Sequence, residues 1–202
     1  MDLETAVRKL IDVGAFMHDR GWVPATSGNF SARLDDGTIA ITVSGRHKGQ
    51  LTPEDIMRVD MRCHSLDGRR PSAETLLHTT LYQRYPEIYS VLHPHSVGSV
   101  LVSRLFSDKL HIRGYELLKA LNGITTHESA VDIPIFENSQ DITSLSKEVI
   151  DYMDAHGDIY GYIIAHHGFY TWGNSVEEAL RHVEALEFLF NLEARLQGAH
   201  PA

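Results

Sequence analysis

The sequence predicts one α/β domain in which a central mixed, largely antiparallel sheet is flanked by helices. Amphipathic helical stretches and short apolar strand-like stretches are mixed along the chain without strict alternation, which is typical of a mixed sheet with helices on its faces. A DDG turn at 35–37 joins two strand-like stretches as an antiparallel hairpin. No linker, internal repeat or low-complexity tract divides the chain, so we expect a single domain over residues 1–202.

The first half is predicted to contain two helices and the hairpin. Apolar residues recur at helical spacing over residues 3–20, and Gly21 ends this helix. The stretches NFSARL and TIAITVS are the arms of the hairpin. TPEDIMRVD reads as a short capped helix or turn. SAETLLHTTLYQRYP reads as a helix with Ser72 at its N-cap and a proline past its end.

The second half is predicted to alternate between buried strands and helices. The strands are expected in IYSVLHPHS, AVDIPIF, IYGYIIAHH and FYTWG. Helices are expected in SVGSVLVSRLF, YELLKAL and TSLSKEVIDYMDAH, the last ending at Gly157. A long helix closes the chain, and Ser175 with Glu178 has the spacing of a capping box at its start.

Charge and cysteine content exclude several classes of protein. The chain carries 18 Lys and Arg against 27 Asp and Glu, a formal net charge of −9, which argues against a nucleic-acid partner but permits a small phosphorylated substrate. Cys63 is the single cysteine, so no internal disulfide is possible. The N-terminal stretch lacks the layout of a signal peptide, and no run approaches ~18 apolar residues. We therefore expect a cytoplasmic protein without a membrane span.

Two pairs of histidines end two apolar strands. His93 and His95 lie two residues apart in YSVLHPHSVGSV, and His166 and His167 end YIIAHHG. A lone His-x-His is structural more often than not, but a second pair at the end of a second buried strand favours a metal site. Catalytic zinc takes three protein ligands, and imidazole also suits iron, nickel or copper. The sequence therefore predicts a three-histidine metal site at one edge of the sheet.

Two glutamates are candidates for acid–base chemistry. Glu74 falls in the first turn of a predicted helix, where plain capping is the alternative explanation. Glu116 falls in the mostly apolar stretch GYELLKAL, where burial would raise its pKa and suit it to proton transfer. The alternative for Glu116 is a solvated helix face.

Two turns rich in small residues are candidates for an anion site. They are TSGNFS at 26–31 and SGRHKG at 44–49, and such turns form nests of backbone N–H groups that bind phosphate. The side chains of Ser27, Ser44 and Lys48 would add donors, as would Ser72 at a helix start. Each turn alone is more often only a turn, so the prediction depends on their occurring together with the histidines.

The motifs as a set resemble the class II aldolase/adducin superfamily. ATSGNFSAR, SGRHKGQL, PSAETLLH, LHPHS and AHHGFYTWG occur in that family's order, and the resemblance covers about residues 5–195. It implies a central mixed sheet and an oligomer, commonly a tetramer, with active sites near subunit boundaries. It also implies one Zn²⁺ per subunit, held by His93, His95 and His167. His166 falls at a position that varies in the family pattern.

The same resemblance assigns the other site residues. The acid–base glutamate of the family's aldolases matches Glu74, that of its dehydratases matches Glu116, and this chain has both. The residues that match the family's phosphate-binding loops are Ser27, Gly28, Asn29, Ser44, Gly45 and Ser72. The second serine of the aldolase pattern is Ala73 here.

Within the superfamily, the stretches HPHS, YELLKAL, PIFEN and HHGFYTWG are most similar to a sugar-phosphate dehydratase. The resemblance thus implies metal-dependent removal of water from a small phosphorylated sugar. Aldol cleavage of a sugar phosphate is the main alternative. A non-catalytic, adducin-like module is a further alternative, and the retained histidine set argues against it.

Overall fold

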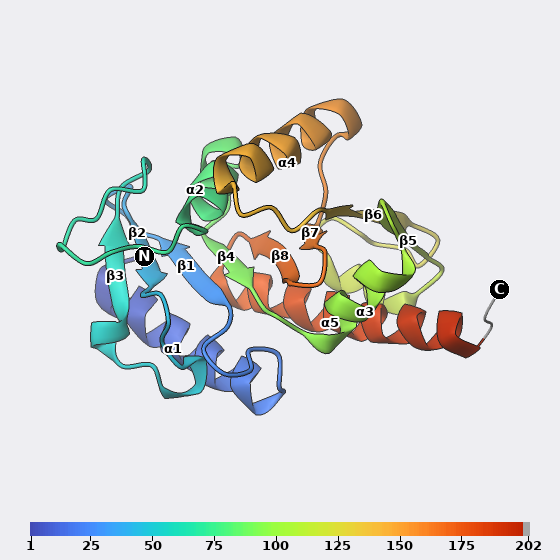
Figure 1. The fold of residues 1–202 in the computed structure, drawn as a ribbon, viewed down its shortest axis with the longest axis horizontal. Helices are drawn as coiled ribbons and strands as arrows, with labels where there is room; N and C mark the ends of the chain where they lie inside the picture. The colour runs from blue at the N-terminus through green and yellow to red at the C-terminus, as the bar shows by residue number, and fades with distance from the viewer. Residues whose placement is uncertain (200–202) are drawn as a thin grey trace.

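The computed structural model describes residues 1–199 as an eight-stranded sheet between two layers of helices (Figure 1). The strand order is β3-β2-β1-β4-β8-β7-β6-β5, and every neighbouring pair is antiparallel except β6 and β7. The expected mixed, largely antiparallel sheet is therefore confirmed. The last residues of the expected domain, 200–202, lie outside the described part of the chain. The strands are β1 (Asn29–Arg33), β2 (Ile39–Thr42), β3 (Ile56–Val59), β4 (Ser90–His93), β5 (Lys109–Arg113), β6 (Ala130–Phe136), β7 (Gly161–Ile164) and β8 (Gly168–Gly173).

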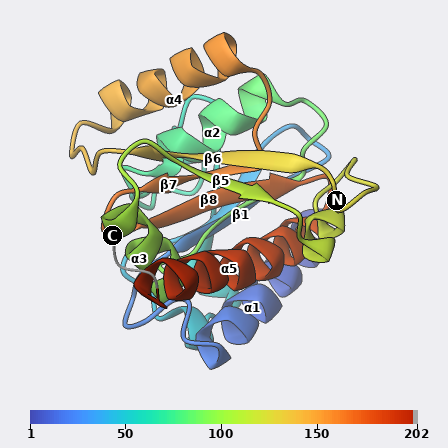
Figure 2. The ribbon, with the colours of Figure 1, turned by 90° about the vertical axis from the view of Figure 1, so that its right-hand side faces the viewer.

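Helices cover both faces of the sheet (Figure 2). Helices α1, α3 and α5 lie on one face, and α2 and α4 lie on the other. Among the described residues, no helix combines the length and the apolar character needed to cross a bilayer. The α-helices are α1 (Leu3–Asp19), α2 (Thr75–Arg84), α3 (Val97–Leu105), α4 (Ile142–His156) and α5 (Val176–Ala199). Short 3₁₀ helices are η1 (Lys48–Gln50), η2 (Pro53–Asp55) and η3 (Glu116–Ala120).

Each central strand sends alternate side chains into two separate cores. In β4, Leu92 packs in the core under α1 and α5, whereas Val91 packs in the core under α2 and α4. Phe169 and Tyr170 of β8 divide in the same way. This period of two is the reason why the strand after Leu92 aims His93 at the α2 and α4 side. There its ring stacks on Tyr170, with ring centroids 4.0 Å apart.

The register of the sheet brings six strand ends to one edge. Asn29 at the start of β1 pairs with His93 at the end of β4. Gly168 at the start of β8 pairs with Ile164 at the end of β7, and Ile164 pairs with Phe136 at the end of β6. The end of β2 lies beside the start of β1, where Thr42 accepts a hydrogen bond from the backbone of the strand. Loops that are distant in sequence therefore meet along this edge.

Two strands differ from the sequence expectation. The residues after η2 form β3 rather than part of a turn or helix, and the sequence prediction contained no strand for β5. β5 reads KLHIR and alternates exposed and buried residues, so only Leu110 and Ile112 carry an apolar signal. An edge strand of this kind is recognised from its pairing with β6 and not from its composition.

Candidate metal centre and active site

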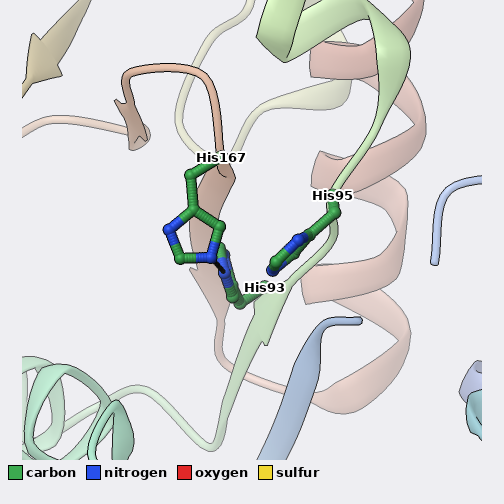
Figure 3. Close-up of side chains that lie close together, drawn as sticks. All are labelled: His93, His95 and His167. Carbon is green, nitrogen blue, oxygen red and sulfur yellow. Dashed lines mark hydrogen bonds between the residues drawn. The ribbon is translucent and has the colours of Figure 1, made fainter. Parts of the chain in front are cut away.

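Three histidines converge at this edge of the sheet (Figure 3). His93 is the last residue of β4, His95 follows it in the segment before α3, and His167 lies in the turn between β7 and β8. One ligand nitrogen from each ring lies within 4.8 Å of the other two. The structure thus brings together the three side chains that the sequence predicts as ligands.

The hydrogen bonds of these rings leave nitrogen lone pairs facing one another. Nδ1 of His93 donates to the backbone oxygen of Phe169 at 2.8 Å, so its Nε2 carries a free lone pair. That Nε2 lies 3.4 Å from Nε2 of His167. Nε2 of His95 is buried and has no hydrogen-bond partner in the described part of the chain. Because buried nitrogens need a partner, this donor set fits a metal ion that accepts three imidazoles.

Burial keeps two of the rings in the form that a metal requires. Burial lowers the pKa of His93 well below its usual value, and the neighbouring His167 lowers it further. Burial, followed by the charges of the other two rings, lowers the pKa of His95 to about 2. Both rings are therefore neutral at physiological pH, and neutral imidazole is the form that binds metal ions.

Two glycines allow the backbone to approach this cluster. A side-chain carbon added at Gly168 would lie 2.3 Å from the oxygen of Pro94 and 3.0 Å from Cε1 of His93. Gly28 has a φ of +78°, and a carbon added there would lie 2.7 Å from the oxygen of His93. His166 precedes His167 in the turn and has a φ of +59°. Its own side chain is exposed and lies outside the cluster, whereas the side chain of His167 points inward.

Glu74 lies against the same cluster. Its Oε1 is 3.3 Å from Nε2 of His167 and 3.8 Å from Nε2 of His93. Its side chain is only 16% exposed. Within the described residues it is the only carboxylate that pairs with these three rings, so in a single chain it is the group placed to exchange protons beside a bound metal.

A buried chain of hydrogen bonds holds the other oxygen of Glu74. Nδ2 of Asn29 donates to Oε2 of Glu74, and Nε2 of His78 bonds Oδ1 of Asn29. Ser31 Oγ then lies 2.7 Å from Nδ1 of His78 and 2.9 Å from the hydroxyl of Tyr82. The three residues behind Asn29, which are His78, Ser31 and Tyr82, are all buried.

The direction of this chain follows from its two ends. A carboxylate only accepts, so the Asn29 amide faces Glu74 with its nitrogen and His78 with its oxygen. His78 must then carry its proton on Nε2. Burial lowers the pKa of His78 to about 3, so it carries only that proton and accepts from Ser31 through Nδ1. Every donor in the chain therefore points toward Glu74.

The two candidate anion turns lie side by side. The Lys48 ammonium is buried and donates to the oxygen of Thr26 at 3.0 Å and to that of Arg46 at 2.7 Å, so it ties one turn to the other. Burial lowers its pKa to about 8. Ser27 Oγ is buried with no hydrogen-bond partner among the described residues. An unpaired buried hydroxyl in one of two adjoining glycine-containing turns is available to a ligand.

The side chain of Asn29 is hydrogen-bonded at both ends, to Glu74 through its nitrogen and to His78 through its oxygen. This is not the environment expected of a phosphate ligand. Ser72 also contacts Glu74, accepting a hydrogen bond from its backbone nitrogen at 3.3 Å. Helix α2 begins at Thr75 rather than directly after Ser72. The phosphate roles of these residues stay predictions.

Glu116 lies elsewhere on this chain. It begins η3, its side chain is 73% exposed, and Lys119 donates to it at 2.6 Å. This hydrogen bond lowers the pKa of Glu116, so the expectation that burial raises it is wrong. The apolar residues around it in sequence pack inward while its own side chain points outward. The structure records no contact between Glu116 and the three histidines in the described residues.

The family model for the class II aldolase and adducin N-terminal domain matches residues 8–194. The chain belongs to this family. It is 61% identical over 197 residues to a methylthioribulose-1-phosphate dehydratase of Methylococcus capsulatus, covering 98% of this chain and 97% of that protein. It is 52% identical to a protein of the same name from Pseudomonas paraeruginosa, covering 96% of this chain and 95% of that one.

Solved structures support the same fold. The L-fuculose-1-phosphate aldolase of Thermus thermophilus superposes with a TM-score of 0.75 at 24% identity, covering 99% of this chain and 97% of that one. A sugar-phosphate aldolase of Thermotoga maritima superposes with a TM-score of 0.70 at 16% identity, covering 97% of this chain and 96% of that one. At these identities the likeness concerns the fold, and the sequence relatives carry the functional comparison.

The hydrogen-bonded chain behind Glu74 was absent from the sequence prediction, although a signal for it existed. Glu74, His78 and Tyr82 recur every four residues, so they share one face of the predicted helix. Asn29 and Ser31 are two apart in a predicted strand and share one side of it. Only the packing of α2 on β1 shows that the two sets meet.

We expect replacement of His95 by Ala to reduce bound metal and activity together, because it removes one of three ligands. Metal content per chain, measured by atomic absorption after dialysis, should fall well below that of the unchanged protein. His166→Asn is the matched control. It removes an imidazole that is next to His167 in sequence but outside the cluster, and asparagine tolerates the positive φ at this position. Undiminished metal in His95→Ala would contradict the three-histidine assignment.

We expect His78→Leu to misplace Glu74, because it removes the donor to Asn29 and leaves buried polar groups unpaired. Stability to urea should fall by roughly 1–3 kcal/mol, the cost of unpaired buried groups. The rate constant kcat should fall more than KM rises, with metal content unchanged. His78→Gln can still donate to Asn29 and should recover most of kcat. Equal loss in both variants would show that His78 only fills space.

Proposed function

We propose that this protein is a zinc-dependent hydro-lyase that converts 5-methylthioribulose 1-phosphate to 2,3-diketo-5-methylthiopentyl 1-phosphate. The observation that carries this proposal is the near full-length identity with proteins named methylthioribulose-1-phosphate dehydratase. The cluster of three imidazoles supports it, because its nitrogens converge and burial keeps His93 and His95 neutral, so it can hold the metal that such chemistry needs. The proposed setting is methionine salvage in the cytoplasm.

His93, His95 and His167 would hold one Zn²⁺ per subunit. When bound, this ion supplies a Lewis acid that polarises the C2 carbonyl of the substrate and so acidifies the proton on C3. The rest of the reaction is proton transfer by the protein. A base removes the C3 proton, an acid protonates the C4 hydroxyl, and that group leaves as water. The resulting enol then tautomerises to the 2,3-diketone.

Glu116 and Glu74 are the proposed acid–base groups. Glu74 already lies beside the histidines. Glu116 reaches a histidine cluster only if another copy of the chain brings it there, which agrees with the homotetramer and boundary active sites that the family resemblance implies. Glu116 borders a cavity with apolar walls from Leu117, Ala120 and Phe188 and further charged residues at Lys119, Arg181 and Glu184. Phe188 is 59% exposed, and a surface of this kind is suited to contact with a second copy.

The phosphate is proposed to bind at the two adjoining turns. Ser27, Gly28, Ser44 and Gly45 offer hydroxyl and backbone donors, Ser72 offers a further hydroxyl, and Lys48 and Asn29 complete the predicted set. The unpaired hydroxyl of Ser27 supports this placement. The phosphate does not react, so its binding energy serves to orient the sugar at the metal.

A second candidate function is aldol cleavage of a ketose phosphate, favoured by the position of Glu74 against the histidines. That position is the one expected for the acid–base group of an aldolase. The two functions predict different products from related substrates. A non-catalytic, adducin-like module is less consistent with the structure, because it has no use for three converging imidazoles.

Product analysis tests the proposal. The zinc-loaded protein incubated with 5-methylthioribulose 1-phosphate should release one water and form the diketone, detected by its mass 18 units below the substrate. Incubation with fuculose or rhamnulose 1-phosphate should give no triose phosphate. Formation of triose phosphate from these sugars, with no diketone from the first substrate, would establish the aldolase instead.

Replacing each glutamate by Gln should separate their roles. We expect Glu116→Gln to retain metal while kcat falls by roughly 10²–10⁴-fold, the usual contribution of general acid–base catalysis. Glu74→Gln should cost less. If Glu74→Gln abolishes turnover and Glu116→Gln does not, the proton chemistry follows the aldolase arrangement.

Mixed oligomers show whether Glu116 acts across a subunit boundary. Glu116→Gln and His95→Ala chains should each be nearly inactive alone. Co-expressed in one oligomer, they should recover activity, because a chain with intact histidines receives Glu116 from its neighbour. No recovery in isolated mixed oligomers would place Glu116 in its own chain's site or outside the reaction.

A further inference from the structure

A cavity adjoins the histidine cluster on the side away from the anion turns. It has a volume of about 220 Å³ and shares Glu74 and His167 with the metal centre. Its other walls come from the end of β7, the first turn of α4, the loop before α4 and the residue before Glu74. These lining residues are Ala73, Asn138, Ser139, Gln140, Ile142, Leu145 and Ile164.

The sheet order places this cavity at one end of a row of sites. The anion turns lie at the ends of β2 and β1, the histidines lie at the ends of β4, β7 and β8, and the cavity lies at the ends of β7 and β6. Neighbouring strands are about 4.8 Å apart, so the three sites follow one another along the sheet edge. A linear substrate can therefore occupy all three in sequence.

The chemical character of the cavity excludes the phosphate end of such a substrate. No lysine or arginine lines it, and its one charged residue is the carboxylate of Glu74. Ile142, Leu145 and Ile164 supply aliphatic surface, and Leu145 and Ile164 are almost fully buried. Ala73 adds a methyl group directly beside Glu74. Asn138, Ser139 and Gln140 add uncharged polar groups on the loop side, so the favoured occupant is an uncharged group that packs on the aliphatic wall.

The loop at the mouth of the cavity is held in place before any ligand binds. Ser139 Oγ accepts a hydrogen bond from the backbone of Asp141 at 3.1 Å. The Asp141 carboxylate then caps α4 by accepting from the backbone of Ser144 at 3.0 Å. Ile142, the next residue, is therefore fixed at the first position of the helix. A preorganised apolar wall of this kind can discriminate between substrates.

We propose that this cavity binds the methylthio group at C5 of the substrate and that Ala73 and Ile142 set the specificity for it. The inference rests on the proposed function, because that substrate carries phosphate on C1, the carbonyl on C2 and the thioether at the opposite end. The order of these groups matches the order of the anion turns, the histidines and the cavity along the sheet edge. A thioether methyl is apolar and uncharged, as the cavity requires.

The test compares two substrates, 5-methylthioribulose 1-phosphate and 5-deoxyribulose 1-phosphate, which lacks only the methylthio group. The unchanged protein should prefer the first by roughly 10–200-fold in kcat/KM, as expected for loss of a group that fills an apolar pocket. Ile142→Phe and Ala73→Leu each add bulk to the cavity, and each should reduce this preference by at least ~10-fold. Two variants at different walls guard against a folding defect in either one.

Thr143→Phe is the matched control, because Thr143 is exposed in the same helical turn and does not line the cavity. It should keep the preference of the unchanged protein. The subsite is wrong if the unchanged protein shows no preference, or if both cavity variants lower kcat/KM equally for the two substrates. If the unchanged protein dehydrates neither substrate, the proposed function fails and the subsite fails with it.

Discussion

The site depends on holding three imidazoles together at one point at the edge of the sheet, with two of them kept neutral by burial. Water is excluded from His93, so its charged form is disfavoured and its ring needs partners from the protein. The backbone of Phe169 accepts its proton, and Tyr170 stacks on its face. These contacts require β8 to run against the end of β4, and only a glycine at position 168 leaves room for that approach. The histidine cluster and the local fold therefore place the same requirement on the backbone.

A second constraint acts behind the histidines. There a chain of hydrogen bonds, with only one possible arrangement of its protons, holds the Glu74 carboxylate in place. Asn29 can serve Glu74 only in one amide orientation, and that orientation determines the tautomer of His78. Ser31 and Tyr82 then have one arrangement of their hydroxyl protons. Because each group is buried and satisfied, reversing any member would leave a neighbour unpaired. Glu74 is thus held in one position although it also lines a cavity.

The sequence was most informative where chemistry and local pattern coincide. The His-x-His pair and His167 could be placed at strand ends because short continuous apolar runs, typical of buried strands, precede both. The role of His78 could not be assigned from one chain position, since its partners Ser31 and Asn29 lie some 47 and 49 residues away. For Glu116 the local sequence pattern was misleading, because it predicted a buried carboxylate and the side chain is exposed. Its neighbours in η3 are apolar, yet a 3₁₀ turn directs the glutamate to solvent while Leu118 is buried.

Dehydration and aldol cleavage differ in the direction in which one proton moves. Aldol cleavage removes a proton from the C4 oxygen and returns one to C3, whereas dehydration removes the proton from C3 and delivers one to the C4 oxygen. Both reactions use the same carbonyl activation, so three histidines and the predicted anion turns do not distinguish them. The position of the carboxylates relative to C3 and C4 does. Among the described residues of a single chain, only Glu74 faces the cluster, and the family resemblance matches Glu74 to the acid–base group of the aldolases. In the proposed reaction, the choice of dehydration over aldol cleavage therefore depends on Glu116 from a neighbouring copy and not on the metal ligands.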